Sequence, residues 1–144
     1  TVDQRSWSLP CSPEIIQRRH TGMTRYRQEL GRSGEKMAAD HLTASGYTIL
    51  ETNYTTRFAE IDIIAATEDC LVFVEVKARS NLRKGFPREA VNSFKQHKII
   101  QAAQQFLKTR SSADWRHVRF DVVEIYFGTD EPRINHIPHA FHIG

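Results

Sequence analysis

The chain has 144 residues, a formal net charge of +3 and a hydrophobic fraction of 40%. This length and composition predict one globular domain. No apolar run approaches the ~20 residues that a membrane-spanning helix needs, and the N-terminus lacks the apolar core of a secretory signal, so we expect a cytoplasmic protein with no membrane partner. The small net charge gives no evidence by itself for a nucleic-acid partner.

Residues 1–23 contain Pro10 and Pro13 and show no clean hydrophobic period, so we interpret them as an N-terminal tail before a domain at 24–144. The domain is expected to begin with a helix from about Thr24 to Ser45. Gly46 follows it, where a helix C-cap favours a left-handed residue. One face of this predicted helix carries a repeating stripe of Leu30, Gly34, Met37, His41 and Leu42.

The rest of the chain is expected to form strands and one further helix. That helix should begin near Arg88, after Pro87, and end near Lys108 or Thr109, with an inner stripe of Val91, Phe94, Ala102 and Phe106. The predicted strands are Tyr47–Leu50, Glu60–Ala65, Cys70–Arg79, Val118–Phe127 and a last one, interrupted by Pro138, at Ile134–His142. The order α-β-β-β-α-β, with this last strand added, predicts an α/β fold in which helices flank a mixed sheet.

The segment from Leu71 to Lys77 is the most informative part of the sequence. Its residues are apolar on both faces, which is typical of a central strand covered on both sides. Glu75 and Lys77 continue the face of Leu71 and Phe73, so two charges come at the end of a buried face. Burying charge costs several kcal/mol per ion unless the ion is paired or binds a metal, so this arrangement favours a functional role.

A hairpin connects this strand with the one before it, through a turn centred on Glu68 and Asp69. That register places Asp62 opposite Glu75 and Glu60 opposite Lys77, with all four charges on one face. Two facing carboxylates repel unless a cation lies between them. Carboxylate oxygens at this distance suit Mg²⁺ or Mn²⁺ better than zinc.

Other candidate residues lie outside the hairpin. Glu35 sits at the edge of the first helix's stripe, from which it could reach the sheet; the alternative is a solvated helix position. Lys95, in the second helix, is either a phosphate contact or a lysine at the stripe edge with its ammonium in water. Arg119 and Asp121 flank Phe120 and are expected to form a structural pair. From Lys77 onward a loop-like stretch is basic and free of acidic residues, with Arg79, Arg83, Lys84 and Arg88.

Taken together, these motifs resemble the YraN-like family of bacterial proteins, a group of predicted endonucleases similar to archaeal Holliday junction resolvases. The resemblance covers residues 26–127. It is carried by Gly31-x-x-Gly34-Glu35, Glu60-Ile61-Asp62, Phe73-Val74-Glu75-Val76-Lys77-x-Arg79, Lys95 and Arg119-Phe120-Asp121. The family usually has glycine before Glu60, where this chain has Ala59.

The resemblance implies a restriction-endonuclease-like fold and a PD-(D/E)XK site. In that site Asp62 and Glu75 would hold Mg or Mn, Glu35 would be the helix carboxylate and Lys77 the catalytic lysine. The expected reaction is hydrolysis of phosphodiester bonds in DNA, with branched or non-duplex DNA as one substrate class by analogy. Neighbouring phosphates would be bound by Arg79, Arg83, Lys84, Arg88 and Lys95.

Two other hypotheses stay open at this point. The chain could be a nucleic-acid-binding module that keeps the nuclease fold without cutting, or a structural domain with an internal ion cluster. A homodimer is a further expectation, because similar resolvases act as dimers.

Overall fold

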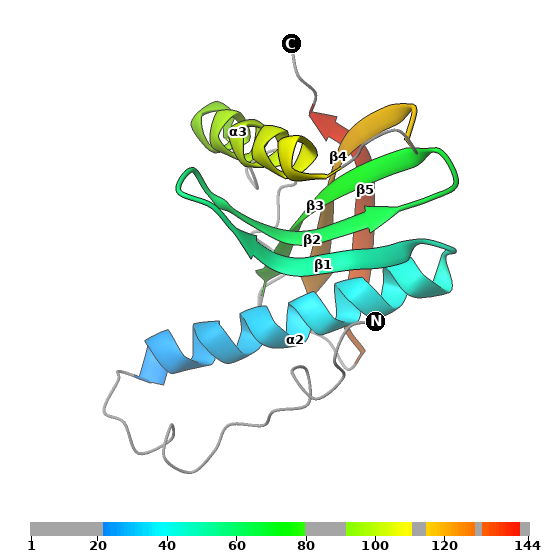
Figure 1. The fold of residues 1–144 in the computed structure, drawn as a ribbon. Helices are drawn as coiled ribbons and strands as arrows, with labels where there is room; N and C mark the ends of the chain where they lie inside the picture. Colours follow the sequence, from blue (N-terminus) through cyan, green and yellow to red (C-terminus); the bar gives the residue numbers. More distant parts are fainter. Residues whose placement is uncertain (1–21, 80–91, 111–114, 129–130, 142–144) are drawn as a thin grey trace.

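The computed structural model describes residues 22–79, 92–110, 115–128 and 131–141. In this part of the chain, five strands form one mixed sheet with a helix on each face (Figure 1). The elements are α2 (Gly22–Ala44), β1 (Thr48–Thr55), β2 (Glu60–Ala66), β3 (Cys70–Arg79), α3 (Ser93–Thr109), β4 (His117–Tyr126) and β5 (Arg133–Phe141). The predicted α/β class and element order are confirmed, and the arrangement is consistent with a restriction-endonuclease-like fold.

The strands lie in the order β1-β2-β3-β4-β5. Neighbouring strands are antiparallel except β3 and β4, which are parallel, with α3 in the connection between them. The β2–β3 hairpin has the predicted register, because Ile63 pairs with Val74 and Ile64 with Phe73. Asp62 and Glu75 are the next two residues in that register.

The end of α2 is also as predicted. Gly46 has a φ of +98°, and its amide donates to the carbonyl of Thr43 at 3.1 Å. The amide of Tyr47 donates to the carbonyl of Leu42 at 2.9 Å. These two bonds form a Schellman motif, which turns the chain directly from the helix into β1. The helix begins at Gly22, two residues before the expected Thr24.

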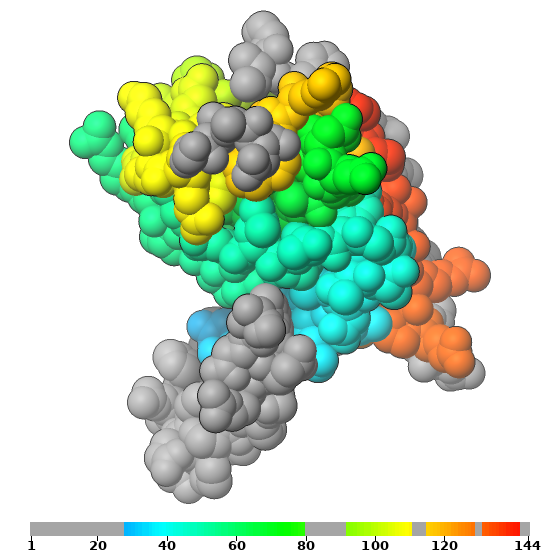
Figure 2. Space-filling view, turned by 45° about the vertical axis from the view of Figure 1, so that its right-hand side comes forward, coloured from blue at the N-terminus to red at the C-terminus, as the bar shows by residue number. Residues whose placement is uncertain are grey.

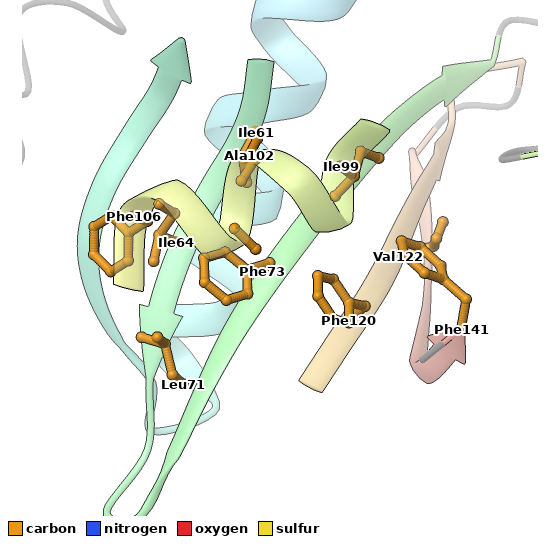
Figure 3. Close-up of a cluster of buried hydrophobic side chains, with 11 residues drawn as sticks. Ile61, Ile64, Leu71, Phe73, Ile99, Ala102, Phe106, Phe120, Val122 and Phe141 are labelled. Atoms are coloured by element: carbon orange, nitrogen blue, oxygen red, sulfur yellow. The ribbon is translucent and has the colours of Figure 1, made fainter. Parts of the chain in front are cut away.

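Each face of the sheet has its own core. On the α3 side, Phe73, Phe106, Phe120 and Phe141 are buried among the aliphatic residues, as Figure 3 shows. On the α2 side, Leu42 and small helix residues cover the valines of β3. The helix comes close here because Gly34 has no side chain: a Cβ at this position would lie 3.1 Å from that of Ala78.

Two predicted bounds were wrong. The strand expected at Tyr47–Leu50 continues to Thr55, through polar residues without an apolar alternation. The second helix begins at Ser93 rather than near Arg88, because the Asn92 side chain caps it by accepting from the amide of Lys95 at 2.9 Å.

The inner stripe of α3 also differs from the expected one. Phe94, expected to face inward, is 71% exposed, and Ile99 and Ala103 are buried instead. Ala102 and Phe106 are buried as predicted. Val91 lies outside the described residues.

In the space-filling view, α3 (yellow) and α2 (cyan) lie on separate sides of the strands, and β5 (orange to red) forms one flank (Figure 2). None of the helices in the described ranges is both long and apolar enough to cross a membrane.

Candidate metal and nuclease site

The candidate site lies where β2 separates from β3. The ladder pairs between these strands end at Ile63 and Val74, and one Asp62 carboxylate oxygen then accepts from the amide of Val76 at 2.8 Å. The carboxylate thereby replaces a backbone acceptor that the departing strand no longer supplies. The side chain of Asp62 is consequently fixed between the two strands.

The predicted placement of four charges on one face needs a correction. Ile61 packs in the α3-side core together with Ile64, so the alternation of faces is interrupted around Asp62. Glu60 is exposed and pairs with Thr55 of β1, because the ladder to β3 has already ended. The expected opposition of Glu60 and Lys77 is therefore wrong.

The ionised form of Asp62 is strongly disfavoured. Burial, followed by repulsion from Glu75, raises the pKa of Asp62 to about 8, although the Val76 amide acts in the opposite direction. Glu35 and Glu60 add smaller repulsions. At neutral pH the carboxyl group of Asp62 therefore keeps its proton unless an added cation compensates its charge.

Glu75 has two lysine neighbours. Its Oε2 accepts from the Nζ of Lys95 at 2.7 Å and lies 4.0 Å from the Nζ of Lys77. Glu75 is only 5% exposed, and the ammonium groups of Lys95 and Lys77 are the cations that balance its charge. Burial, and then repulsion from Lys95, lowers the pKa of the Lys77 ammonium. Burial also disfavours the charge of Lys95, but the hydrogen bond and attraction to Glu75 outweigh it and raise the pKa of Lys95.

Glu35 joins the group from α2. It accepts a hydrogen bond from the Asn53 side chain at 3.2 Å. Burial, opposed by this hydrogen bond and supported by repulsion from Glu60 and Glu75, raises its pKa. The helix carboxylate expected from the sequence therefore lies within electrostatic range of Asp62 and Glu75.

The donor set suits a hard divalent cation in its chemistry, because the three carboxylates that repel one another here all present oxygen ligands. Among the described residues, however, no three His, Cys, Asp or Glu side chains are arranged closely enough to hold a metal ion. Lys95 also occupies one oxygen of Glu75. The residues fit a metal in type, and their side chains would have to draw together to bind one.

The predicted nucleic-acid-binding residues divide into two groups. Lys95 lies against the site, as described, and Arg79 is at the end of β3, with its Nε 3.9 Å from the buried carboxylate of Glu124. Arg83, Lys84 and Arg88 lie outside the described residues. Glu124 itself was not predicted as a site residue, because the alternation in its segment indicated only a packed strand.

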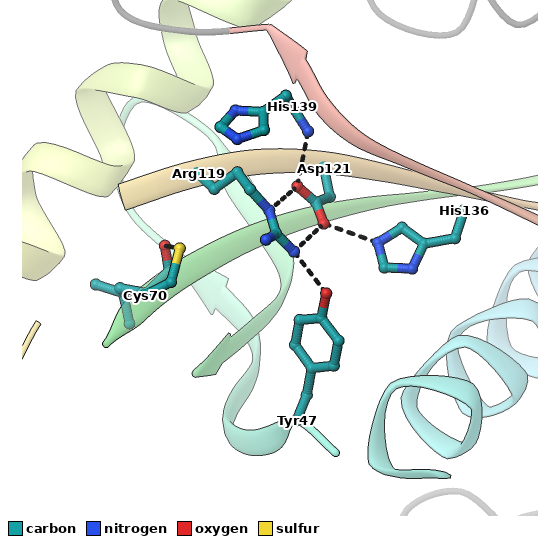
Figure 4. A network of polar contacts seen from close by, with 7 residues as sticks. Tyr47, Cys70, Arg119, Asp121, His136 and His139 are labelled. Atoms are coloured by element: carbon teal, nitrogen blue, oxygen red, sulfur yellow. Dashed lines mark hydrogen bonds and ion pairs between the residues drawn. The ribbon is translucent and has the colours of Figure 1, made fainter. Parts of the chain in front are cut away.

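A second polar cluster lies around Asp121, which is fully buried (Figure 4). Arg119 donates to both oxygens of Asp121 at 2.9 Å, which confirms the expected structural pair. Asp121 also accepts from the backbone amide of His139 at 3.1 Å and contacts the Nε2 of His136 at 2.7 Å. Arg119 further donates to the hydroxyl of Tyr47. No pattern in the sequence indicated these three partners.

Replacing Asp62 with asparagine is expected to stabilise the fold at alkaline pH. Unfolded aspartate loses its proton near its ordinary pKa of 3.8, whereas folded Asp62 keeps it to about pH 8. The stability of the native chain should therefore fall as pH rises through this window. An asparagine side chain has no such loss and still accepts from the Val76 amide, so we expect a gain of several kcal/mol at pH 8 that disappears near pH 4.

Urea unfolding in EDTA at several pH values measures this difference. Glu68→Gln, at an exposed turn residue, is the matched control and should change stability little at any pH. An Asp62→Asn protein that is less stable than the native chain at pH 8 would contradict the raised pKa of Asp62 in the folded protein.

Comparison with known proteins gives a consistent assignment. The model of the uncharacterised protein family UPF0102 matches residues 34–125. Similar proteins include UPF0102 proteins of Desulforapulum autotrophicum, 50% identical over 83% of this chain and 98% of the relative, and of Clostridioides difficile, 46% identical over 79% and 97%. A third, from Rhodococcus opacus, is 47% identical over 78% and 95%. The matched region contains Glu35, Asp62, Glu75 and Lys77, and the chain belongs to the UPF0102 family, as its YraN-like motifs indicated.

Proposed function

We propose that this chain is a metal-dependent nuclease that hydrolyses phosphodiester bonds in DNA. The observation that carries the proposal is the strained Asp62, with its pKa raised to about 8 beside Glu75 and Glu35 and next to two lysines. An ion pair that serves only stability would match each buried carboxylate with a cation. Here Asp62 has no cation of its own among the described residues and would carry its negative charge at neutral pH only when a further cation arrives, which is typical of a functional site.

Asp62 and Glu75 would hold the cation, with Glu35 on its outer side. When bound, Mg²⁺ or Mn²⁺ would supply Lewis acidity toward a phosphate and promote the ionisation of water. Lys95, which now contacts Glu75, would become free to bind a phosphate oxygen.

Lys77 is the best candidate for direct participation. Its ammonium lies beside Glu75 and is half-buried, and its lowered pKa makes proton exchange easier than for an exposed lysine. It would orient the attacking water or stabilise the negative charge that builds on the phosphate oxygens during attack.

One contact favours a second candidate, a nucleic-acid-binding module without cleavage. The bond between Lys95 and Glu75 neutralises the carboxylate that the nuclease hypothesis assigns to the metal. A chain in which this pair never opens would present lysines and Arg79 to nucleic acid and would not cut it.

The test is a cleavage assay on labelled duplex, single-stranded, flapped and four-way DNA, in Mg²⁺, in Mn²⁺ and in EDTA. We expect cleavage of at least one substrate with a divalent ion and none in EDTA. Binding to DNA without cleavage under any condition would favour the binding module. If the chain neither binds nor cleaves DNA and gives no calorimetric signal with Mn²⁺, the hypothesis of a structural domain would be favoured.

A further inference from the structure

A second buried carboxylate lies beside the candidate site on the same face of the sheet. Lys77 of β3 is in register with Glu124 of β4, and Arg79 with Tyr126. Because paired residues of parallel strands point to the same side, Glu75, Lys77 and Arg79 form one row and Glu124 and Tyr126 form part of the next. Glu124 is fully buried, although no step proposed above uses it.

The two oxygens of Glu124 are in different situations. Oε1 accepts from the Tyr126 hydroxyl and from the Asn135 side chain, both at 3.0 Å. Oε2 is buried without a hydrogen bond and lies 3.9 Å from the Nε of Arg79, which is also buried without a hydrogen-bond partner among the described residues. A buried acceptor and a buried donor are therefore held opposite each other, separated by slightly more than a hydrogen-bond distance.

This geometry affects how Arg79 can be used. Its Nε, the nitrogen nearest the aliphatic stem, is buried 3.9 Å from Glu124, whereas 24% of the side chain remains exposed. A guanidinium paired with Glu124 at its Nε keeps terminal N–H donors for a phosphate, although it also contacts the Tyr126 hydroxyl. Holding the side chain in advance also removes part of the entropy that a free arginine would lose on binding.

We propose that Glu124 is a positioning residue that holds Arg79 as a phosphate-binding group beside the carboxylate site. The proposal rests on the proposed function in that the ligand is a nucleic-acid backbone. Arg79 lies two residues beyond Lys77 on the strand, about 7 Å away, so it would bind a phosphate next to the one that is cut.

The direction in which Glu124→Gln changes DNA affinity shows whether Glu124 positions Arg79 or only cancels its charge. If Glu124 only cancelled the charge of Arg79, Glu124→Gln would make the surface more basic and would tighten DNA binding. If Glu124 positions Arg79, the same variant should weaken binding several-fold, because a neutral amide fixes the guanidinium less well. Arg79→Lys should lose nearly as much as Arg79→Ala, because lysine keeps the charge and lacks the Nε.

The experiment measures DNA affinity against salt concentration in EDTA, so that no strand is cut. Arg79→Ala should lower the slope of log affinity against log salt by about one, and Glu124→Gln combined with Arg79→Ala should add little to Arg79→Ala alone. Tyr126→Phe keeps the carboxylate charge but removes a hydrogen bond to Glu124 and a contact with Arg79, so its affinity should lie between those of the native chain and Glu124→Gln. Thermal unfolding of each variant shows whether it is folded.

Several results would overturn the proposal. Tighter or unchanged DNA binding by folded Glu124→Gln would do so, as would additive losses of affinity in the double variant. Native affinity in Arg79→Lys would also overturn it, and this result can be obtained even if Glu124→Gln does not fold. Cleavage that depends on a divalent ion, together with native binding by Glu124→Gln, would refute this proposal alone. Binding that follows the expected pattern without any cleavage would refute the nuclease and leave the role of Glu124 standing. No DNA binding at all would refute both.

Discussion

Glu75→Gln is expected to lower metal-dependent DNA cleavage by about 10³-fold, measured as kcat at saturating DNA. The substitution keeps the size of the side chain and an acceptor for Lys95, but it removes the charge that would hold a divalent cation. Lys77→Ala should cause a loss of about 10²-fold or more in the same assay, because no other described ammonium with a lowered pKa lies beside Glu75.

The matched control is Glu51→Gln. Glu51 is also a strand glutamate with a basic partner, Arg110, but that partner is at the opposite end of α3 from Lys95. The two ends are about 20 Å apart along the helix, so activity should be unchanged. Cleavage that persists at native level in purified Glu75→Gln and Lys77→Ala would indicate a contaminating nuclease or another active centre.

Asp121→Ala is expected to produce the largest loss of stability, about 3–5 kcal/mol. The variant would leave the Arg119 guanidinium and the His139 amide without the carboxylate that now accepts from both. For a chain of this size the loss corresponds to a decrease in Tm of about 10 °C or more. Thermal unfolding followed by circular dichroism at neutral pH measures it.

The control for this variant is Asp40→Ala, which removes an exposed aspartate paired with Lys36 on the surface of α2. It should change stability by less than about 0.5 kcal/mol. An Asp121→Ala protein whose Tm lies within about two degrees of the native value would show that the network contributes almost nothing.

The pH dependence of the Asp121 network has a definite sign. Burial disfavours the charge of Asp121, but hydrogen bonds from His136, Arg119 and His139 outweigh it and lower its pKa below the ordinary 3.8. A carboxyl group whose pKa is lower in the folded state than in the unfolded state stabilises the fold at pH values above its unfolded pKa. This stabilisation is lost as the pH falls through the pKa of the folded state. The difference between the native chain and Asp121→Asn should therefore shrink in acid below about pH 4, opposite to the window for Asp62.

The sequence predicted β3 and its hairpin well, because both depend on local pattern. Cys70–Arg79 has apolar residues on both faces, and a one-residue slip of the hairpin would have exposed them. That register brought Asp62 beside Glu75, and helical periodicity placed Glu35 near them. These three carboxylates could therefore be grouped from the sequence alone.

What could not be predicted depends on which strands become neighbours. Glu124 meets Arg79, and Asp121 meets His136, only because β4 lies between β3 and β5. Nothing in the spacing of residues 119–136 specifies that order. The early end of the β2–β3 ladder was also missed, because the Val76 amide donates to a side-chain acceptor that periodicity does not reveal.

The last strand has a consequence for self-association. Between Phe141 and Ile137 the pairing of β5 with β4 shifts, and here His139 adopts a φ of +52°. Pro138, in the same irregular stretch, has no N–H to offer to a further strand. The opposite edge strand, β1, has a register shift of its own near Leu50. Bulges and proline in edge strands discourage the addition of a strand from another molecule, so both borders of this sheet carry features that oppose edge-to-edge aggregation.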